Sequence, residues 1–451
     1  MKKLLALTLA MILALSLAAC GSPEKDVPPD SAANPPADSQ QTPDPAPADK
    51  PFDGQTITVV TTGSGPVYAA EKHLKEFEEA TGIHVVLEQY EFQEAINRIA
   101  INAAAGGSDI DVLCYRPIQE TVTWNNSGYF APLNDYIEAA GPEYDYEDFS
   151  PAAREVTTVD GTIVGVPYLT EGEMLWCNTD ILERYNQSVP TTLDELLAVA
   201  KACYDPANNV YGIALRGEGN GAVTQFSGFL YAFGGDFFDK ELNATMNTPE
   251  ALQALEYYAD LIACGPEGSD VATMINSMDW FINGVAAMRV DAYTHNISIK
   301  DPEQSLVADT LAWSPLPAGP KGSTPYNIVA WAWGISATSE KKDAAWEFIE
   351  WISGKEMDVE GMVEGGSSAR VSTWADPRSA TNNSPAFMEA VATISEIGLP
   401  YDRPFCDNAA EVRALVGQMI DAANAGQRGE ELKATVEALN TQMQAILDTE
   451  K

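Results

Sequence analysis

The stretch ITVVTTGSGPVYAAEKHLKEFEEATGIHVVL, residues 57–87, decides the fold class of this chain. It opens with a β-branched run that is typical of a strand. A turn at Gly63-Ser64-Gly65 follows, and apolar residues then recur at helical spacing from Val67 to Phe77. Gly82 stands where a glycine ends a helix, and a second apolar run follows it. The stretch therefore predicts a strand, a helix and a second strand in succession.

The same alternation continues along the chain, with a helix predicted over 95–105 and a third strand over 111–115. A β-α-β-α-β order implies a mainly parallel sheet flanked by helices, which is an α/β fold. Thr191 or Thr192 caps a later helix, and Pro249 opens another. Further strands are expected at 174–177, 211–215, 287–290 and 329–335, and amphipathic helices at 341–352 and 430–447.

Composition excludes several classes of partner. The 451 residues contain 26 Lys and Arg against 66 Asp and Glu, a formal net charge of −40, and 45% are hydrophobic. The apolar share is sufficient for a large core. The acidity argues against nucleic acid, which requires clustered cations, and against docking of the folded surface on anionic lipid headgroups.

The N-terminus predicts export. Lys2 and Lys3 precede an almost wholly apolar run, so residues 1–19 are interpreted as a signal peptide. Leu17-Ala18-Ala19-Cys20 resembles the lipobox of bacterial lipoproteins, which implies lipidation at Cys20 and an anchor on the outer face of the cytoplasmic membrane. Residues 20–51 are dominated by Pro, Ala, Asp and Ser and are expected to form a disordered tether.

The sequence contains no recognisable metal or cofactor motif. Its three histidines lack ligand spacing, no cysteine pair has CxxC spacing, and there is no GxSxG. The Gly63–Gly65 turn resembles half of a dinucleotide fingerprint, but Tyr68 occupies the third glycine position. Pairing of Cys203 with Cys264 stays open, although free thiols are favoured. We therefore expect no metal, no cofactor and no nucleic acid.

Two polar and aromatic patterns suggest a binding site. Glu171 and Glu173 lie two apart on a predicted strand and share a face. Paired carboxylates serve glycosidases, whereas a single carboxylate in a cleft accepts hydrogen bonds from vicinal hydroxyls. Trp331 and Trp333 also alternate on one strand, and indoles cover the apolar faces of sugars. A secreted glycosidase is one alternative that these residues leave open.

The order of motifs resembles the extracellular solute-binding proteins of bacterial ABC importers, in their carbohydrate-binding branch. The resemblance covers residues 52–451 and rests on 77–85, 107–112, 128–133, 165–178, 190–196, 234–235, 281–284 and 345–349. Details such as Trp331-Ala332-Trp333 are similar to the sorbitol- and mannitol-binding type. The chain departs from that type at Gly172-Glu173, Cys177 and Arg289, so the resemblance favours a sugar-like solute more firmly than a polyol.

The resemblance implies a two-lobed α/β protein without enzymatic activity, with one lobe from 52–168 plus 320–365 and the other from 169–319 plus 366–451. It implies a monomer that binds a small carbohydrate or polyol in the cleft between the lobes and delivers it to an ABC permease. The expected ligand-binding residues are Gly63, Ser64, Gly65, Tyr115, Arg116, Glu171, Gly234, Gly235, Asp291, Tyr293, Trp331, Trp333 and Arg370. In an alternative, Arg116, Arg289 and Arg370 converge on the carboxylate of an anionic solute or a peptide.

Overall fold

The first five elements follow the predicted alternation. Strand β1 (Thr56–Thr62) pairs in parallel with β2 (His84–Tyr90) and β3 (Val112–Tyr115), and helices α1 (Gly65–Thr81) and α2 (Phe92–Ala104) connect them. Gly82 ends α1 with φ of 84°, a backbone conformation that residues with a Cβ rarely adopt. The computed structural model describes residues 50–451, so the signal peptide, Cys20 and the tether as far as residue 49 lie outside the described residues.

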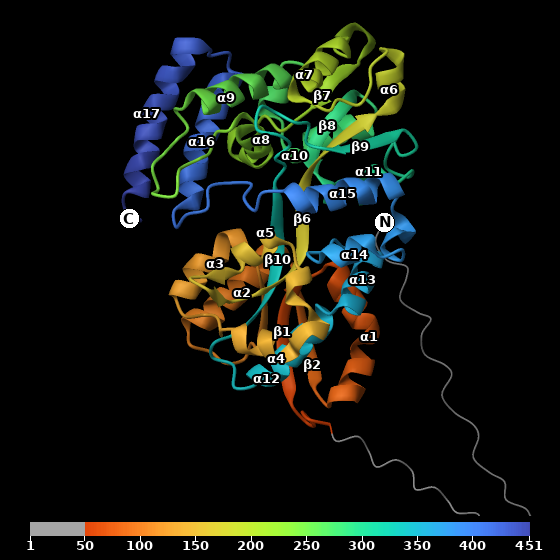
Figure 1. The fold of residues 1–451 in the computed structure, drawn as a ribbon, viewed down its shortest axis with the longest axis vertical. Coiled ribbons are helices and arrows are strands. Elements are labelled where there is room, and N and C mark those ends of the chain that lie inside the picture. The colour runs from red at the N-terminus through yellow and green to blue at the C-terminus, as the bar shows by residue number, and fades with distance from the viewer. Residues whose placement is uncertain (1–49) are drawn as a thin grey trace, which may run out of the picture. The chain divides into compact units, whose positions relative to one another are not determined.

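One long strand, β6 (Val166–Asn178), pairs with strands of both sheets of the fold, and β10 (Asn327–Ile335) runs beside its first part (Figure 1). Strand β10 pairs antiparallel with β3 and with the first part of β6. The second part of β6 pairs antiparallel with β8 (Ala286–Ala292) and β9 (Leu311–Pro315). The remaining strand of this sheet, β7 (Tyr211–Ala214), runs parallel to β8.

The α/β class is confirmed, but the sheets are mixed rather than mainly parallel. The strand order is β2-β1-β3-β10-β6-β8-β7, with β9 beside β6. Strand β10 runs antiparallel to β3 and β6, and β6 runs antiparallel to β8 and β9, so these two strands introduce pairs that the local β-α-β pattern does not predict.

Helices cover both sheets, and side-chain caps begin several of them. Thr192, one of the two predicted caps, forms a capping box with Glu195 at α7 (Leu193–Ala202). Helix α9 (Pro249–Ile262) begins at Pro249, as the sequence predicts, and Thr248 is its cap. The other helices are α3 (Pro117–Asn126), α4 (Asn134–Tyr144), α5 (Pro151–Val156), α6 (Thr179–Arg184), α8 (Gly219–Phe233), α10 (Met274–Ile282), α11 (Asn296–Ile299), α12 (Lys342–Ile352), α13 (Lys355–Val363), α14 (Val371–Ala375), α15 (Pro385–Ile397), α16 (Ala409–Asn424) and α17 (Gly429–Leu447). A short hairpin, β4 (Thr158–Val159) and β5 (Thr162–Ile163), completes the elements.

Two large apolar cores underlie the two sheets. The first takes its buried residues from 57–168 and 329–369, and the second from 175–316 and 412–447. A smaller cluster around Trp176, Tyr293 and Phe387 packs on the opposite face of the second sheet. The lobe limits given above stay a prediction. Cys203 and Cys264 both carry free thiols. Within residues 50–451, no helix combines the length and apolar character that a bilayer crossing demands.

Candidate functional site

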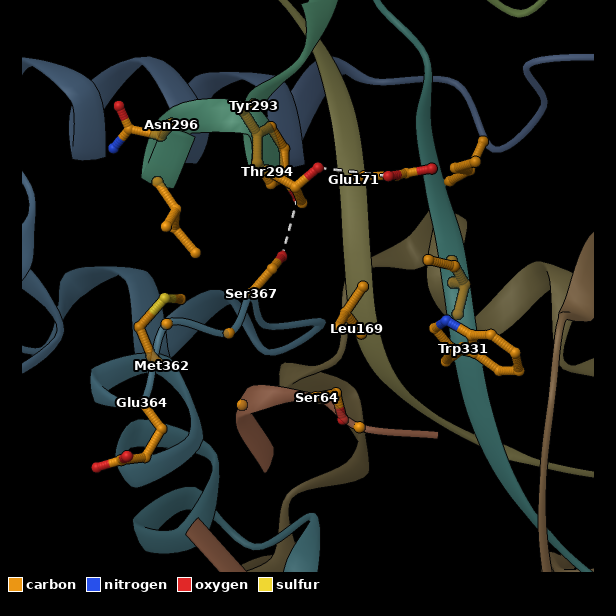
Figure 2. A pocket seen from close by; sticks show the side chains of 18 of the residues that line it. Ser64, Leu169, Glu171, Tyr293, Thr294, Asn296, Trp331, Met362, Glu364 and Ser367 are labelled. Carbon is orange, nitrogen blue, oxygen red and sulfur yellow. Dashed lines mark hydrogen bonds between the residues drawn. The ribbon is translucent and has the colours of Figure 1, made fainter. Parts of the chain in front are cut away.

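A cavity of about 630 Å³ opens beside β6 and β10. The parts of the chain that meet there include the turn after β1, the start of α3, the segment after β8 and the segment between α13 and α14. Figure 2 shows side chains from the turn after β1, the segment after β8 and the segment after α13 around the same space. Seven of the predicted site residues line this cavity: Gly63, Ser64, Gly65, Arg116, Glu171, Tyr293 and Trp331.

The glycine turn brings backbone to the cavity wall. A Cβ on Gly65 would lie 2.4 Å from the carbonyl oxygen of Gly361, so only glycine fits at this approach of α1 to α13. Ser64 precedes α1, and its Oγ is buried without a hydrogen-bond partner among the described residues. A polar atom of this kind beside a cavity is available to a bound solute.

Two carboxylates line the cavity, and Glu171, unlike Glu364, has no ion-pair partner among the described residues. Thr294 Oγ1 donates to Glu171 Oε2 at 3.4 Å (Figure 2). Burial raises the pKa of Glu171, and Asp402 raises it further, whereas Arg216 and Arg403 lower it. The carboxylate therefore retains acceptor capacity that the protein does not use.

Other charged groups around the cavity have protein partners. Arg116 pairs with Glu120, one turn along α3, and Arg403 pairs with Asp402. Glu364 pairs with Lys72 at 2.5 Å. Lys300 Nζ donates to Asn383 Oδ1 at 3.1 Å, and burial lowers its pKa. The charges of the cavity wall are thus largely balanced within the protein.

The aromatic wall differs from the one that the sequence predicts. Tyr293 and Trp374 contact each other edge to face at 5.6 Å between ring centroids, and Phe387 and Trp331 also line the cavity. Tyr115 is fully buried against Phe130 in the first core and does not line the cavity. Its ring packs against Trp124 and Phe130 and close to Gly165.

Trp333 lies apart from Trp331, contrary to the predicted shared face. The register of β10 against β6 shifts on either side of Trp331, which breaks the alternation of the strand. Trp333 stacks on Tyr168 at 4.3 Å inside the first core, whereas Trp331 borders the cavity.

Gly234 and Gly235 also lie outside the cavity lining. Gly234 ends α8 with φ of 91°, and a Cβ there would lie 2.8 Å from the Lys321 side chain. A Cβ on Gly235 would lie 2.5 Å from Leu230. This glycine pair serves the helix terminus, so the expected approach of its backbone to a ligand is not seen.

Asp291 belongs to a buried ionic cluster instead of the cavity lining. Its carboxylate accepts hydrogen bonds from Arg216 Nε at 2.9 Å, from Arg289 Nη2 at 2.7 Å and from the backbone N–H of Ala292 at 2.8 Å. Burial opposes ionisation, but Arg216 and Arg289 together lower the pKa of Asp291. Asp291 and Arg289 are both fully buried, so neither is available to a solute.

Arg370 anchors the chain rather than donating into the cavity. It is fully buried and donates to the carbonyl oxygens of Tyr144, Asp145 and Ser353 at 2.8–3.0 Å. Its guanidinium also lies 4.0 Å from the ring centroid of Phe149. Because Arg289 and Arg370 are both engaged in this way, the predicted convergence of three arginines on an anionic solute is wrong.

Glu173 does not form a catalytic pair with Glu171. It is fully buried, lies outside the cavity lining, and neither carboxylate oxygen has a hydrogen-bond partner in the described chain. A Cβ on Gly228 of α8 would lie 1.7 Å from Glu173 Oε2. Burial raises the pKa of Glu173 well above its usual range, and the nearby Asp291 raises it further.

Several lining residues carry no signal in the sequence. Ser367, Trp374, Asn383, Phe387 and Arg403 come from the last quarter of the chain. None belongs to a recognisable motif, and only the long-range return of the chain to β6 and β10 brings them together.

Comparison with protein families identifies one match that covers most of the body. Residues 60–359 match the family of bacterial extracellular solute-binding proteins. An erythritol/L-threitol-binding protein of Mycolicibacterium smegmatis is 28% identical over 340 residues, 69% of each chain. A mannitol-binding protein of Pseudomonas aeruginosa is 26% identical over 336 residues, 71% of this chain and 75% of its own.

Solved structures share the fold. A solute-binding protein from Agrobacterium radiobacter in complex with ribitol has a TM-score of 0.71 and 23% identity, covering 88% of this chain and 100% of its own. The sugar-binding protein MalE of Xanthomonas citri has a TM-score of 0.73 and 21% identity, covering 88% of this chain and 98% of its own. Both support the two-lobed architecture and, at these identities, nothing more specific.

Proposed function

This chain belongs to the bacterial extracellular solute-binding proteins, and from that premise we propose that it captures a sugar or sugar alcohol. The observation that carries the proposal is Glu171, an acceptor with little internal compensation at the wall of a cavity that also holds aromatic rings. Carboxylates accept hydrogen bonds from vicinal hydroxyls, and aromatic faces cover the C–H surface of a carbohydrate.

The balance of charge supports a neutral solute. Arg116, Arg403 and Glu364 each form an ion pair within the protein, and the two further arginines proposed for an anion are engaged elsewhere. A solute carboxylate would have to displace one of these partners, which leaves a charge uncompensated and costs free energy. The relatives named for erythritol/L-threitol and mannitol favour polyols as the first class to test.

We propose further that the protein is lipidated at Cys20 and delivers its solute, as a monomer, to an ABC permease. Support comes from the Leu17-Ala18-Ala19-Cys20 motif and from the acidic, Pro-rich segment that follows it. Closure of two lobes requires a solute that contacts both of them, and the segments that follow β1 and β8, strands of different sheets, both line the cavity. Metabolic labelling with palmitate tests the anchor, because a Cys20→Ala variant should incorporate no label.

A thermal-shift screen tests the solute class. The purified protein is heated with erythritol, ribitol, mannitol, maltose, the matching sugar acids and a set of peptides. A solute that binds only the native state raises Tm according to RT ln(1 + [L]/Kd). We expect a shift with a neutral polyol or sugar, without turnover of that compound. Shifts with sugar acids or peptides alone would contradict the proposal.

A further inference from the structure

Thr170 occupies the centre of a hydroxyl network behind the cavity wall. It lies on β6 between Leu169 and Glu171, which both line the cavity, but it is itself only 1% exposed and does not line it. Its side chain meets Tyr293, which follows β8, and the segment of Ser367 and Ser368, which follows α13. One buried hydroxyl therefore connects two parts of the cavity wall.

The donors in this network can be assigned one by one. Thr170 Oγ1 lies 2.6 Å from the carbonyl oxygen of Ser368, and a carbonyl only accepts, so the single proton of Thr170 points there. The hydroxyl of Tyr293 lies 2.7 Å from Thr170 Oγ1. Because the proton of Thr170 is already engaged, Tyr293 must be the donor in this contact.

Ser367 is constrained in the same way. Its hydroxyl donates to the backbone carbonyl oxygen of Thr170, again an acceptor only. Ser367 Oγ and the Tyr293 oxygen lie 3.5 Å apart, the contact drawn in Figure 2. Each of these two hydroxyls has therefore used its proton on Thr170, and each keeps lone pairs beside the cavity.

The nearest aromatic donor is engaged as well. The indole N–H of Trp374 donates to the carbonyl oxygen of Ser368 at 3.1 Å. Glu171, on the same strand as Thr170, contributes carboxylate oxygens that only accept when ionised. Hydrogen-bond donors at this part of the wall are thus turned away from the cavity, whereas acceptors border it.

We propose that this wall recognises solute hydroxyl groups as donors, and that Thr170 is the positioning residue that fixes this polarity. The inference rests on the proposed function and deepens it, because it names the chemical group that the site selects. A free hydroxyl donates to Tyr293 or Ser367. An ether oxygen cannot donate a hydrogen bond. Its lone pairs would therefore face the lone pairs of the Tyr293 and Ser367 oxygens in a desolvated site.

The penalty for such a mismatch sets the expected discrimination. Leaving a buried acceptor without a donor weakens the binding of the solute by about tenfold or more. Replacing the solute hydroxyl that reaches Tyr293 and Ser367 by a methoxy group should therefore weaken binding to the wild-type protein by about tenfold or more. Methylation of a hydroxyl elsewhere on the solute should have a smaller effect unless it clashes.

Isothermal titration with matched solutes tests the inference. The probes are erythritol, ribitol and mannitol, each beside its full set of mono-O-methyl ethers. The proteins are the wild type, Thr170→Val and Thr170→Ser. In Thr170→Val the Tyr293 hydroxyl loses its acceptor and is free to donate to an ether. The largest polyol-to-ether ratio of the wild type should then fall to within about threefold, whereas Thr170→Ser should retain it.

The outcomes distinguish a failure of the proposed function from a failure of this inference. No binding of any polyol to the wild type would overturn the proposed function, and this inference with it. Polyol binding with equal affinity for all the ethers would overturn the inference alone. An unchanged ratio in Thr170→Val, with its fold verified by circular dichroism, would overturn the role of Thr170. Should Thr170→Val fail to fold, Tyr293→Phe replaces it, because removal of that acceptor must also lower the ratio.

Discussion

Two carboxylates beside the middle of strand β6 stand in opposite situations. Asp291 lies on β8, opposite Met174 of β6, and is enclosed by two arginines and a backbone N–H. Glu171 lies on β6 itself, three residues before Met174, and its carboxylate accepts a hydrogen bond from the Thr294 hydroxyl at 3.4 Å. A saturated ionic cluster and a carboxylate with unused acceptor capacity therefore lie close together along one strand.

The difference teaches that the protein partners of a charged group, rather than its residue type, decide whether it has a structural role or is available to a solute. Asp291 keeps its negative charge because Arg216 and Arg289 offset the cost of burial, and no lone pair remains for a solute. Burial raises the pKa of Glu171, so the protein tolerates a charge there that it does not fully stabilise. Unused hydrogen-bonding capacity at a cavity is what a bound hydroxyl compound completes.

Removal of Asp291 should produce the largest effect on stability. Asp291→Ala leaves Arg216 and Arg289 buried without their common partner, and such a loss costs about 3–5 kcal/mol of unfolding free energy. Urea denaturation of the wild type and the variant measures this difference. The matched control is Glu171→Ala, which should cost less than about 1 kcal/mol. Equal losses in the two variants would remove the distinction between the two carboxylates.

Asp358 sharpens the comparison, because it is buried but held mainly by hydroxyls. Thr373 Oγ1 donates to it at 2.5 Å, and Ser368 Oγ donates to the same oxygen. Burial raises the pKa of Asp358 to about 6, although these hydroxyls and Arg370 lower it and Asp148 raises it. Hydroxyl partners thus stabilise a buried charge less well than the two arginines of Asp291 do.

The raised pKa of Asp358 predicts a pH dependence of stability. The folded state binds this proton more tightly than the unfolded chain, so the contribution is fully present below about pH 4 and is lost as pH rises to about 6. Relative to Asp358→Asn, the wild type should gain on the order of 2–3 kcal/mol between pH 7 and pH 4. Urea unfolding of both proteins at several pH values measures the gain. A constant difference would show that Asp358 titrates normally.

The sequence predicts the elements of the fold because their signals are local. Gly82, Thr192 and Pro249 mark helix ends that the structure contains, and the apolar runs mark the strands. The direction of β10 is different, because pairing with β3 and β6 depends on residues that are more than 150 positions away. Local periodicity does not report such pairing, so a mainly parallel sheet was the natural expectation.

The candidate site was predicted best where one turn or one strand sufficed. The turn at Gly63–Gly65 comes directly after a predicted strand, and Glu171 lies on another predicted strand. Both parts of the chain line the cavity. Arg370 shows the limit: its charge suggests a donor to a solute, but backbone carbonyls that only the folded chain brings together accept its hydrogen bonds. No pattern in the sequence distinguishes an arginine that binds carbonyls of its own chain from one that binds a solute.

Glu171→Gln provides the smallest but most specific test. Gln keeps one acceptor and the volume of the side chain but removes the charge, and a hydrogen bond to a charged group contributes about 1.5–3 kcal/mol. We expect roughly a tenfold to hundredfold loss of affinity for the polyol that binds, measured by isothermal titration. Unfolding free energy should stay within about 0.5 kcal/mol or rise, because the variant no longer bears the cost of a buried charge. Full affinity in Glu171→Gln would place the solute away from Glu171, whereas a loss of both affinity and stability would make Glu171 a structural group like Asp291.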